Sequence, residues 1–177
     1  MAANISQFIS KFNKDVARPC NFEVIIAQPI NQISGADFGD LSFKCEATEL
    51  PSRTFSLVEQ KTYGPVQYFP VQNFYEKVNL TFLCSDDMKE KVLFDTWMEK
   101  ISDSTGSTSP TQFDFNYKSN YSTQVTIIQY SLNGKVSLKT KLFEAFPISV
   151  HPLKLDWGAT DEVHKLMVTF AYRYTTK

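Results

Sequence analysis

Short segments in which apolar and polar residues alternate recur along most of the chain, and they constrain the fold more than any other feature. They are CNFEVIIA (20–27), LSFKCEAT (41–48), YEKVNLTFLC (75–84) and the segment 163–174. A period of two puts one apolar face on an extended strand, so we predict half-buried antiparallel strands. The residues expected to face the core are Cys20, Phe22, Val24, Ile26, Leu41, Phe43, Cys45, Ala47, Val78, Leu80, Phe82, Cys84, Leu166, Val168, Phe170, Tyr172 and Tyr174.

Asn133 and Gly134 separate two further runs, 121–132 and 135–146. Both residue types tolerate the positive φ of a two-residue turn, so the pair predicts a β-hairpin. Apolar residues lie on both faces of the first run, with a phase change at Ile127-Ile128, which either a bulge or burial of both faces explains. In the second run we expect Val136, Leu138, Leu142 and Phe146 to face inward, and Lys135, Ser137, Lys139 and Lys141 to face outward.

One substantial helix is predicted over residues 86–101, DDMKEKVLFDTWMEKI. Ser85 or Asp86 is a suitable N-cap, and acidic residues favour the positive end of a helix. The apolar stripe consists of Met88, Val92, Leu93, Trp97 and Ile101. Methionine and tryptophan at this spacing indicate core packing rather than a cofactor site.

The N-terminal arm, residues 1–18, contains a short amphipathic pattern over residues 4–12. Ile5, Phe8, Ile9 and Phe12 follow the spacing of one helical face. A helix of this length is not stable alone. We therefore expect it to dock on another surface, with Ile5, Phe8 and Phe12 as inter-subunit contacts.

Residues 49–74 form an unusually long connection between two predicted strands. The segment is rich in Phe, Tyr and Val, which a disordered loop would not be. One reading is a loop folded over its own core; the other, which we favour, is an inter-subunit contact. The residues expected to make that contact are Phe55, Val58, Tyr63, Val66, Tyr68 and Phe69.

Length and composition fit one folded domain over residues 1–177. The expected fold is an antiparallel β-barrel or sandwich of about six strands, with one main α-helix (86–101) and a short N-terminal helix. A formal net charge of −1 leaves no electrostatic footprint for stable nucleic-acid binding. No apolar run is long enough for a signal peptide or a membrane span, so we expect a soluble protein made in a cytoplasm.

The three cysteines, Cys20, Cys45 and Cys84, form no CxxC motif. They fall on the predicted apolar faces, which favours packing over reactivity in a reducing compartment. No nucleophile elbow, phosphate-binding loop, dinucleotide motif or HExxH motif occurs, so an enzyme is not expected.

The segment 149–174 holds both histidines and several carboxylates. His151 and His164 are thirteen residues apart, a spacing that does not favour a metal site, and no cofactor is expected. Asp156 lies two residues before Gly158, where a carboxylate can accept backbone N–H groups and hold a turn. We therefore interpret the segment as strand, turn and strand.

Several segments, taken in order, resemble the tail tube protein family of contractile-tailed, T-even-like bacteriophages. They are ARPCNFEV (17–24), FKCEATELP (43–51), MKEKVLFDTWMEKI (88–101) and LKLDWGATDEVHKLMVTFAYRY (153–174). In that family an Ala-Arg-Pro precedes the first strand, a Cys-x-Ala-x-x-Leu-Pro ends the second, and a Leu-Asp-Trp turn leads into the last. The matches are colinear and cover most of the chain.

The resemblance implies a structural subunit of a virion tail, assembled in the host cytoplasm. Such subunits form homohexameric rings that share a central barrel and stack inside a contractile sheath above a baseplate, and double-stranded DNA passes transiently through the lumen. Two alternatives of the same class are the inner tube of a related contractile injection or secretion system and a baseplate tube-initiator ring. A small-ligand-binding β-barrel is the alternative of another class.

Overall fold

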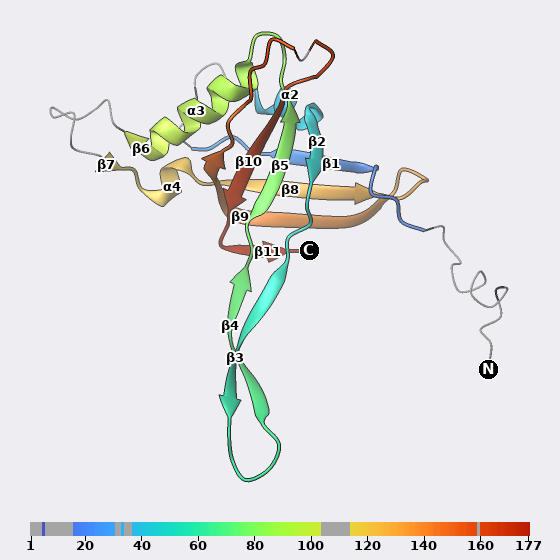
Figure 1. Ribbon diagram of the computed structural model, residues 1–177, viewed down its shortest axis with the longest axis vertical. Helices are drawn as coiled ribbons and strands as arrows, with labels where there is room; N and C mark the ends of the chain where they lie inside the picture. Colours follow the sequence, from blue (N-terminus) through green and yellow to red (C-terminus); the bar gives the residue numbers. More distant parts are fainter. Residues whose placement is uncertain (1–4, 6–15, 31–32, 34–36, 104–113, 159) are drawn as a thin grey trace.

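The computed structural model describes residues 5, 16–30, 33, 37–103, 114–158 and 160–177, and its main feature is a bent antiparallel sheet (Figure 1). Its strands are β1 (Phe22–Ile26), β2 (Cys45–Thr48), β5 (Val78–Leu83), β8 (Thr123–Tyr130), β9 (Val136–Val150), β10 (Lys165–Ala171) and β11 (Tyr174–Thr176). They follow the order β1-β8-β9-β10-β5-β2, and β11 also pairs with β9. The mainly β, antiparallel fold predicted from the alternating segments is thus confirmed.

The remaining elements attach to this sheet. They are the hairpin strands β3 (Arg53–Gln60) and β4 (Gln67–Tyr75), the short pair β6 (Ser102–Asp103) and β7 (Asp114–Phe115), and the helices α2 (Phe38–Phe43), α3 (Lys89–Ile101) and α4 (Lys118–Tyr121). The β3–β4 hairpin extends the chain between β2 and β5 and points away from the rest of the molecule (Figure 1).

Strand β9 belongs to both layers of the fold and bends near Glu144. Its part up to Ala145 pairs with β8, whereas residues 146–150 pair with β10. The β8–β9 register shifts at this point, and Glu144 has a φ of +52°. A bulge bends its strand, and β8 and the first part of β9 run across β10 and β5 in Figure 1. The corner turns one continuous sheet into two layers that face each other.

The space between the layers is filled by apolar side chains. Fully or almost fully buried residues come from β1, β5, β8 and β10, and include Val24, Ile26, Leu80, Phe82, Val125, Ile127, Leu166, Val168 and Phe170. Each of these larger side chains contributes about 1.5–3 kcal/mol by its removal from water. The core therefore forms within one chain, without the β3–β4 hairpin.

Helix α3 closes the core with two aromatic residues. The ring centroid of Phe94 lies 5.2 Å from that of Phe82, and the Trp97 ring lies 5.9 Å from that of Phe170. Trp97 Nε1 donates a hydrogen bond of 2.9 Å to the carbonyl oxygen of Tyr121. This bond satisfies the polar end of an otherwise apolar ring, and it ties α3 to the last residue of α4, just before β8.

The alternating segments around 20–27 and 75–84 form β1 and β5, as predicted. The Asn133-Gly134 hairpin is also present between β8 and β9. In β8 the residues Val125, Thr126, Ile127 and Ile128 are all buried, and the register does not shift between the last two. Burial of both faces, and not a bulge, explains the phase change there.

The segment 41–48 was predicted as one strand, and this is wrong in its first half. Residues 38–43 form helix α2 because Asp37 caps it, accepting hydrogen bonds from the N–H groups of Gly39 and Asp40. Phe43 is consequently exposed, not buried. Only the second half of the segment, β2, is a strand, and there the β2–β5 register shifts between Cys45 and Ala47, so that Ala47 is exposed and does not face the core as expected.

The predicted start of the main helix also needs correction, because α3 begins at Lys89 after Met88, which has a φ of +51°. No side-chain cap from Ser85 or Asp86 is present. On this helix Val92 is 61% exposed although it was expected in the apolar stripe, and Phe94 is buried in its place.

Three further expectations about strands are corrected. The last strand is divided, because Tyr174 lies in β11 and pairs with Phe143 of β9 in the other layer. Val136 is exposed, and Phe146 is only half-buried because the Glu144 bulge shifts the phase so that Ala145 takes the buried position. Residues 49–74 are mostly a β-hairpin and not an irregular loop.

Of the cysteines, Cys20 is exposed and does not lie in the core as expected. Cys45 and Cys84 are half-buried against the core cluster. Burial raises the pKa of the Cys45 thiol to about 12. A thiol that stays protonated at neutral pH is a poor nucleophile, as the packing interpretation of this residue requires.

Replacing Phe94 with Ala should lower the free energy of unfolding by about 3–5 kcal/mol, because it opens a cavity among the three aromatic rings that Phe94 contacts. The matched control is Val92→Ala on the exposed face of the same helix, with an expected change of about 0.5 kcal/mol or less. Urea unfolding followed by far-UV circular dichroism measures both. Equal losses in the two variants would contradict the placement of α3.

Candidate assembly surfaces

The β3–β4 hairpin exposes apolar side chains on both of its faces. Its strands pair from Arg53↔Tyr75 at the base to Gln60↔Gln67 near the tip. Gly64, in the connecting turn, has a φ of +126°, which favours glycine. The exposed apolar residues are Phe55, Leu57, Val58, Tyr63, Val66, Tyr68, Phe69, Val71 and Phe74. All six residues predicted as contacts in this segment are thus exposed, and neither face of the hairpin is covered by the body of its own chain.

The base of the hairpin is held to the body by specific contacts. The Arg53 guanidinium lies 5.1 Å from the ring centroid of Phe55 and 6.0 Å from that of Tyr75. Ser52 Oγ donates a 2.5 Å hydrogen bond to Glu76, which joins the two ends. The Tyr75 ring lies 5.9 Å from that of Tyr172, beyond the end of β10. The hairpin is therefore fixed at its base and free along its length.

The two outer strands of the sheet differ in how well their edges are covered. Strand β1 pairs with β8 on one side, and on the other side Ser42 Oγ of α2 donates to the Val24 carbonyl oxygen. Within the described residues, β2 pairs only with β5. An unpaired strand edge offers backbone groups to another chain.

A buried carboxylate joins α3 to the segments on either side of it. Glu90 is 4% exposed, and its carboxylate accepts hydrogen bonds from Ser85 N at 3.0 Å, from Ser85 Oγ at 2.8 Å and from Lys44 Nζ at 2.7 Å. Burial disfavours the charged form, but the hydrogen bonds from Lys44 and Ser85 outweigh it and lower the pKa of Glu90 to about 2. Glu90 thereby ties the start of α3 to Ser85 and Lys44, but it does not cap the helix.

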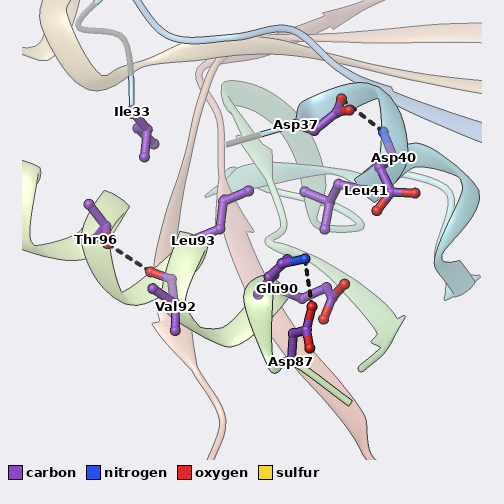
Figure 2. Close-up of a pocket in the computed structure, with 10 residues that line it drawn as sticks. Ile33, Asp37, Asp40, Leu41, Asp87, Glu90, Val92, Leu93 and Thr96 are labelled. Atoms are coloured by element: carbon purple, nitrogen blue, oxygen red, sulfur yellow. Dashed lines mark hydrogen bonds and ion pairs between the residues drawn. The ribbon is translucent and has the colours of Figure 1, made fainter. Parts of the chain in front are cut away.

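A pocket lies beside this network, between α2 and α3 (Figure 2). Ile33, Leu41 and Leu93 form its apolar wall. The acidic residues on its rim are already engaged: Asp37 caps α2, Asp40 pairs with Lys44, and Asp87 pairs with Lys89 at 2.6 Å. In the parts of the chain that the structure describes, no three metal-ligating side chains come together.

Residues 151–158 and 160–164 connect β9 to β10 and include a turn at Asp156. Asp156 Oδ1 accepts a hydrogen bond of 3.0 Å from the N–H of Gly158, and Asp156 Oδ2 lies 3.0 Å from Lys154 Nζ. These two contacts lower the pKa of Asp156. His151 Nε2 lies 3.2 Å from Thr169 Oγ1, while His164 uses its backbone carbonyl to accept from Cys84 N.

At the β8–β9 turn, Gly134 has a φ of +71°, and its N–H donates a hydrogen bond of 2.9 Å to the carbonyl oxygen of Ser131. Ser131 N in turn donates to the carbonyl oxygen of Lys135 at 2.8 Å.

In the N-terminal arm Ile5 is exposed, while Phe8 and Phe12 lie outside the described residues. Among the described helices, none is long and apolar enough to cross a membrane.

A family model described as "phage tail tube protein" matches residues 8–177 of the chain. The chain belongs to the phage tail tube protein family. The match spans both sheet layers, α3, the β3–β4 hairpin and the Asp156 turn. Membership gives the chain a structural role in a tail tube of a phage or a related contractile system, as the sequence resemblance predicted.

Solved structures of contractile systems share the tail tube fold. A chain of the sheath/tube terminator of an extracellular contractile injection system, PVC, is 14% identical, with a TM-score of 0.62 over 93% of this chain and 97% of that one. A chain of the PVC sheath–tube complex is 15% identical, with a TM-score of 0.59 over 99% and 97%. A chain of the anti-feeding prophage baseplate is 12% identical, with a TM-score of 0.62 over 92% and 95%. A search of curated protein sequences gives no match.

Replacing Glu90 with Gln keeps the size of the side chain but removes the charge that Lys44 faces. The pKa of Glu90 is lowered from 4.5 to about 2 in the folded protein, so its charge stabilises the fold above pH 4.5. This contribution disappears as the pH falls through 4.5 towards 2. At about 1.4 kcal/mol per pKa unit, the loss at pH 7 is at most about 3.5 kcal/mol.

Unfolding measurements from pH 7 to pH 2.5 should show the difference between wild type and Glu90→Gln shrinking as the pH falls. Glu99→Gln makes the same charge change at an exposed position of α3 and serves as the control. A stability difference that stays constant with pH would contradict the charged network.

Proposed function

We propose that this chain is the repeating subunit of a phage tail tube, in which six copies form a ring and the rings stack. The observation that carries the proposal is the β3–β4 hairpin, because it exposes apolar residues on both faces while the chain's own core is complete without it. An apolar surface of this extent marks a protein–protein contact. The baseplate structure of the anti-feeding prophage is described as six-fold symmetrised, which agrees with a six-membered ring.

The exposed edge of β2 supports lateral pairing between neighbours in the ring. Within the described residues it has no second strand beside it. Closure of a ring removes such edges, which otherwise lead to uncontrolled association. The N-terminal arm, with Ile5, Phe8 and Phe12, is assigned to the same lateral contacts.

The lumen of the tube conducts double-stranded DNA during ejection into the host. A channel that passes DNA must not hold it, since several phosphate contacts per ring would add up over many rings. The formal net charge of −1 fits a channel of low friction. The proposal therefore includes transient passage of DNA and no stable nucleic-acid binding.

The proposed partners are other copies of the chain, a sheath and a baseplate, and the location is the tail of a virion assembled in the host cytoplasm. A second candidate is the inner tube, or a baseplate ring, of a contractile injection system. The fold similarity to chains of the PVC and anti-feeding prophage particles favours it. Both candidates require the same ring.

A small-ligand carrier finds less support. Such a protein needs an apolar cavity inside its barrel. Here the space between the layers is occupied by side chains such as Phe82, Phe94 and Phe170. The hairpin also points away from the body and does not cover an opening (Figure 1).

The purified protein should form six-membered rings and hollow tubes as its concentration is raised, because the hairpin and strand edges find partners only in other copies. Sedimentation velocity and negative-stain microscopy measure this. A strictly monomeric protein at millimolar concentration would overturn the proposed function.

Shortening the hairpin should leave the subunit folded but impair stacking. Replacing residues 57–71 with Asn-Gly joins Ser56 to Gln72, which neighbour each other across the hairpin near its bulge. Circular dichroism and the unfolding midpoint should stay close to wild type, while tubes disappear. The full-length variant Val58→Thr with Phe69→Thr removes only apolar surface and should weaken stacking in the same direction. An unfolded shortened variant would instead show that the hairpin belongs to the core.

A further inference from the structure

The turn between β9 and β10 presents a second apolar surface. Trp157 is fully exposed, and Leu155 and Val163 beside it are also largely exposed. The Asp156–Gly158 hydrogen bond and the Lys154–Asp156 ion pair hold this turn in shape. Tryptophan is the residue type most enriched at the centres of protein interfaces. A turn that is held by these contacts and leaves its tryptophan exposed is therefore a candidate site of contact with another protein chain.

A groove runs along this turn. Its apolar lining includes Leu153, Leu155, Trp157 and Val163. Its charged lining residues are Lys154, Asp156, Glu162 and Lys165, of which Lys154 pairs with Asp156, and Lys165 pairs with Glu46 outside the groove. The apolar wall suits a flat aromatic side chain, and the Glu162 carboxylate suits a basic group beside that side chain. Within the described residues Glu162 has no ion-pair partner.

The groove and the hairpin tip lie at opposite ends of the molecule. In Figure 1 the tip of β3–β4 is at the bottom, and the turn between β9 and β10 is at the top, next to α2. Two different surfaces at opposite ends of one molecule can join copies head to tail, and such a contact repeats without limit along an axis. Stacked rings require a contact of this kind.

The tip carries groups that complement the groove. Tyr63 is fully exposed, and Lys61 has only a 3.6 Å contact with Glu59. An aromatic ring and a cation at the tip match the apolar lining and the Glu162 carboxylate of the groove. We propose that the hairpin tip of a subunit in one ring docks beside Trp157 of a subunit in the next ring, with Tyr63 against Trp157. This contact rests on the proposed function. It identifies the surface on which the hairpin tip docks, which the proposed function does not specify.

Cross-linking in assembled tubes tests the contact directly. The variant carries Thr62→Cys and Thr160→Cys, exposed positions close to Tyr63 and Trp157 that leave both rings in place, and also Cys20→Ser, because Cys20 is the exposed native cysteine. Treatment with a short bismaleimide should give a ladder of multimers on a denaturing gel, since every subunit offers both ends. The matched control pairs Thr62→Cys with Leu132→Cys, at the exposed β8–β9 turn, in the same Cys20→Ser background. Equal yields from the two pairs would overturn the contact.

A substitution gives a second readout. Trp157→Ala should leave a folded protein that forms rings but needs about 30-fold or more higher concentration to grow tubes, the loss typical of an interface anchor. Phe115→Ala removes an exposed aromatic ring away from both surfaces and should leave tube growth unchanged. Tubes from Trp157→Ala at the wild-type concentration would overturn the contact alone. Wild-type protein that forms no rings would overturn the proposed function and the contact with it.

Discussion

The bend of β9 at Glu144 is the constraint on which the rest of the structure depends. One strand serves two layers, and it can do so only because Glu144 takes a left-handed conformation at the bulge. The Glu144 carboxylate lies 2.7 Å from Lys118 Nζ and 2.9 Å from Arg173 Nη1, groups that precede β8 and follow β10. Both contacts lower the pKa of Glu144. The corner is thus held by charges from the segments that it brings together.

This corner explains why the subunit can be complete in its core and incomplete at its surface. Folding the sheet onto itself buries apolar side chains of β5, β8 and β10 between the two layers, and α3 covers this core. The β3–β4 hairpin leaves the sheet between β2 and β5 at one end, where no layer remains for it to pack on. Its apolar faces therefore stay in water in an isolated copy. We propose that assembly with other copies of the chain removes these faces from water.

Much of the fold was predictable from the sequence, because period-two patterns and the Asn133-Gly134 pair act locally. The errors arise where a local interaction competes with the pattern. Asp37 caps a helix over residues that alternate like a strand. At the start of α3 neither Ser85 nor Asp86 caps the helix, and Glu90 instead binds Ser85 and Lys44, the latter 46 residues away in sequence. The Glu144 bulge shifts the phase of β9, which alternation alone does not reveal. The Asp156 turn could be predicted because the carboxylate and the glycine that it binds are only two residues apart in sequence.

The composition of the proposed contact surfaces was predictable from the sequence, but their shape was not. Phe55, Tyr63 and Phe69 marked the segment 49–74 as a contact, yet the bulged pairing of β3 with β4 follows only from the structure. Trp157 was noticed as part of a turn and not as a surface, because exposure of a side chain depends on what surrounds it in space. The family resemblance supplied the role that neither composition nor charge provides.

The most direct test is a cryo-electron microscopy reconstruction of assembled tubes at a resolution that shows side chains. The claim is that the chain's core is self-sufficient while its hairpin is covered only by other copies. The account predicts that the hairpin keeps its extended form and that its apolar faces are buried against neighbouring subunits. A hairpin folded back onto the body of its own chain, with its apolar residues covered there, would contradict it.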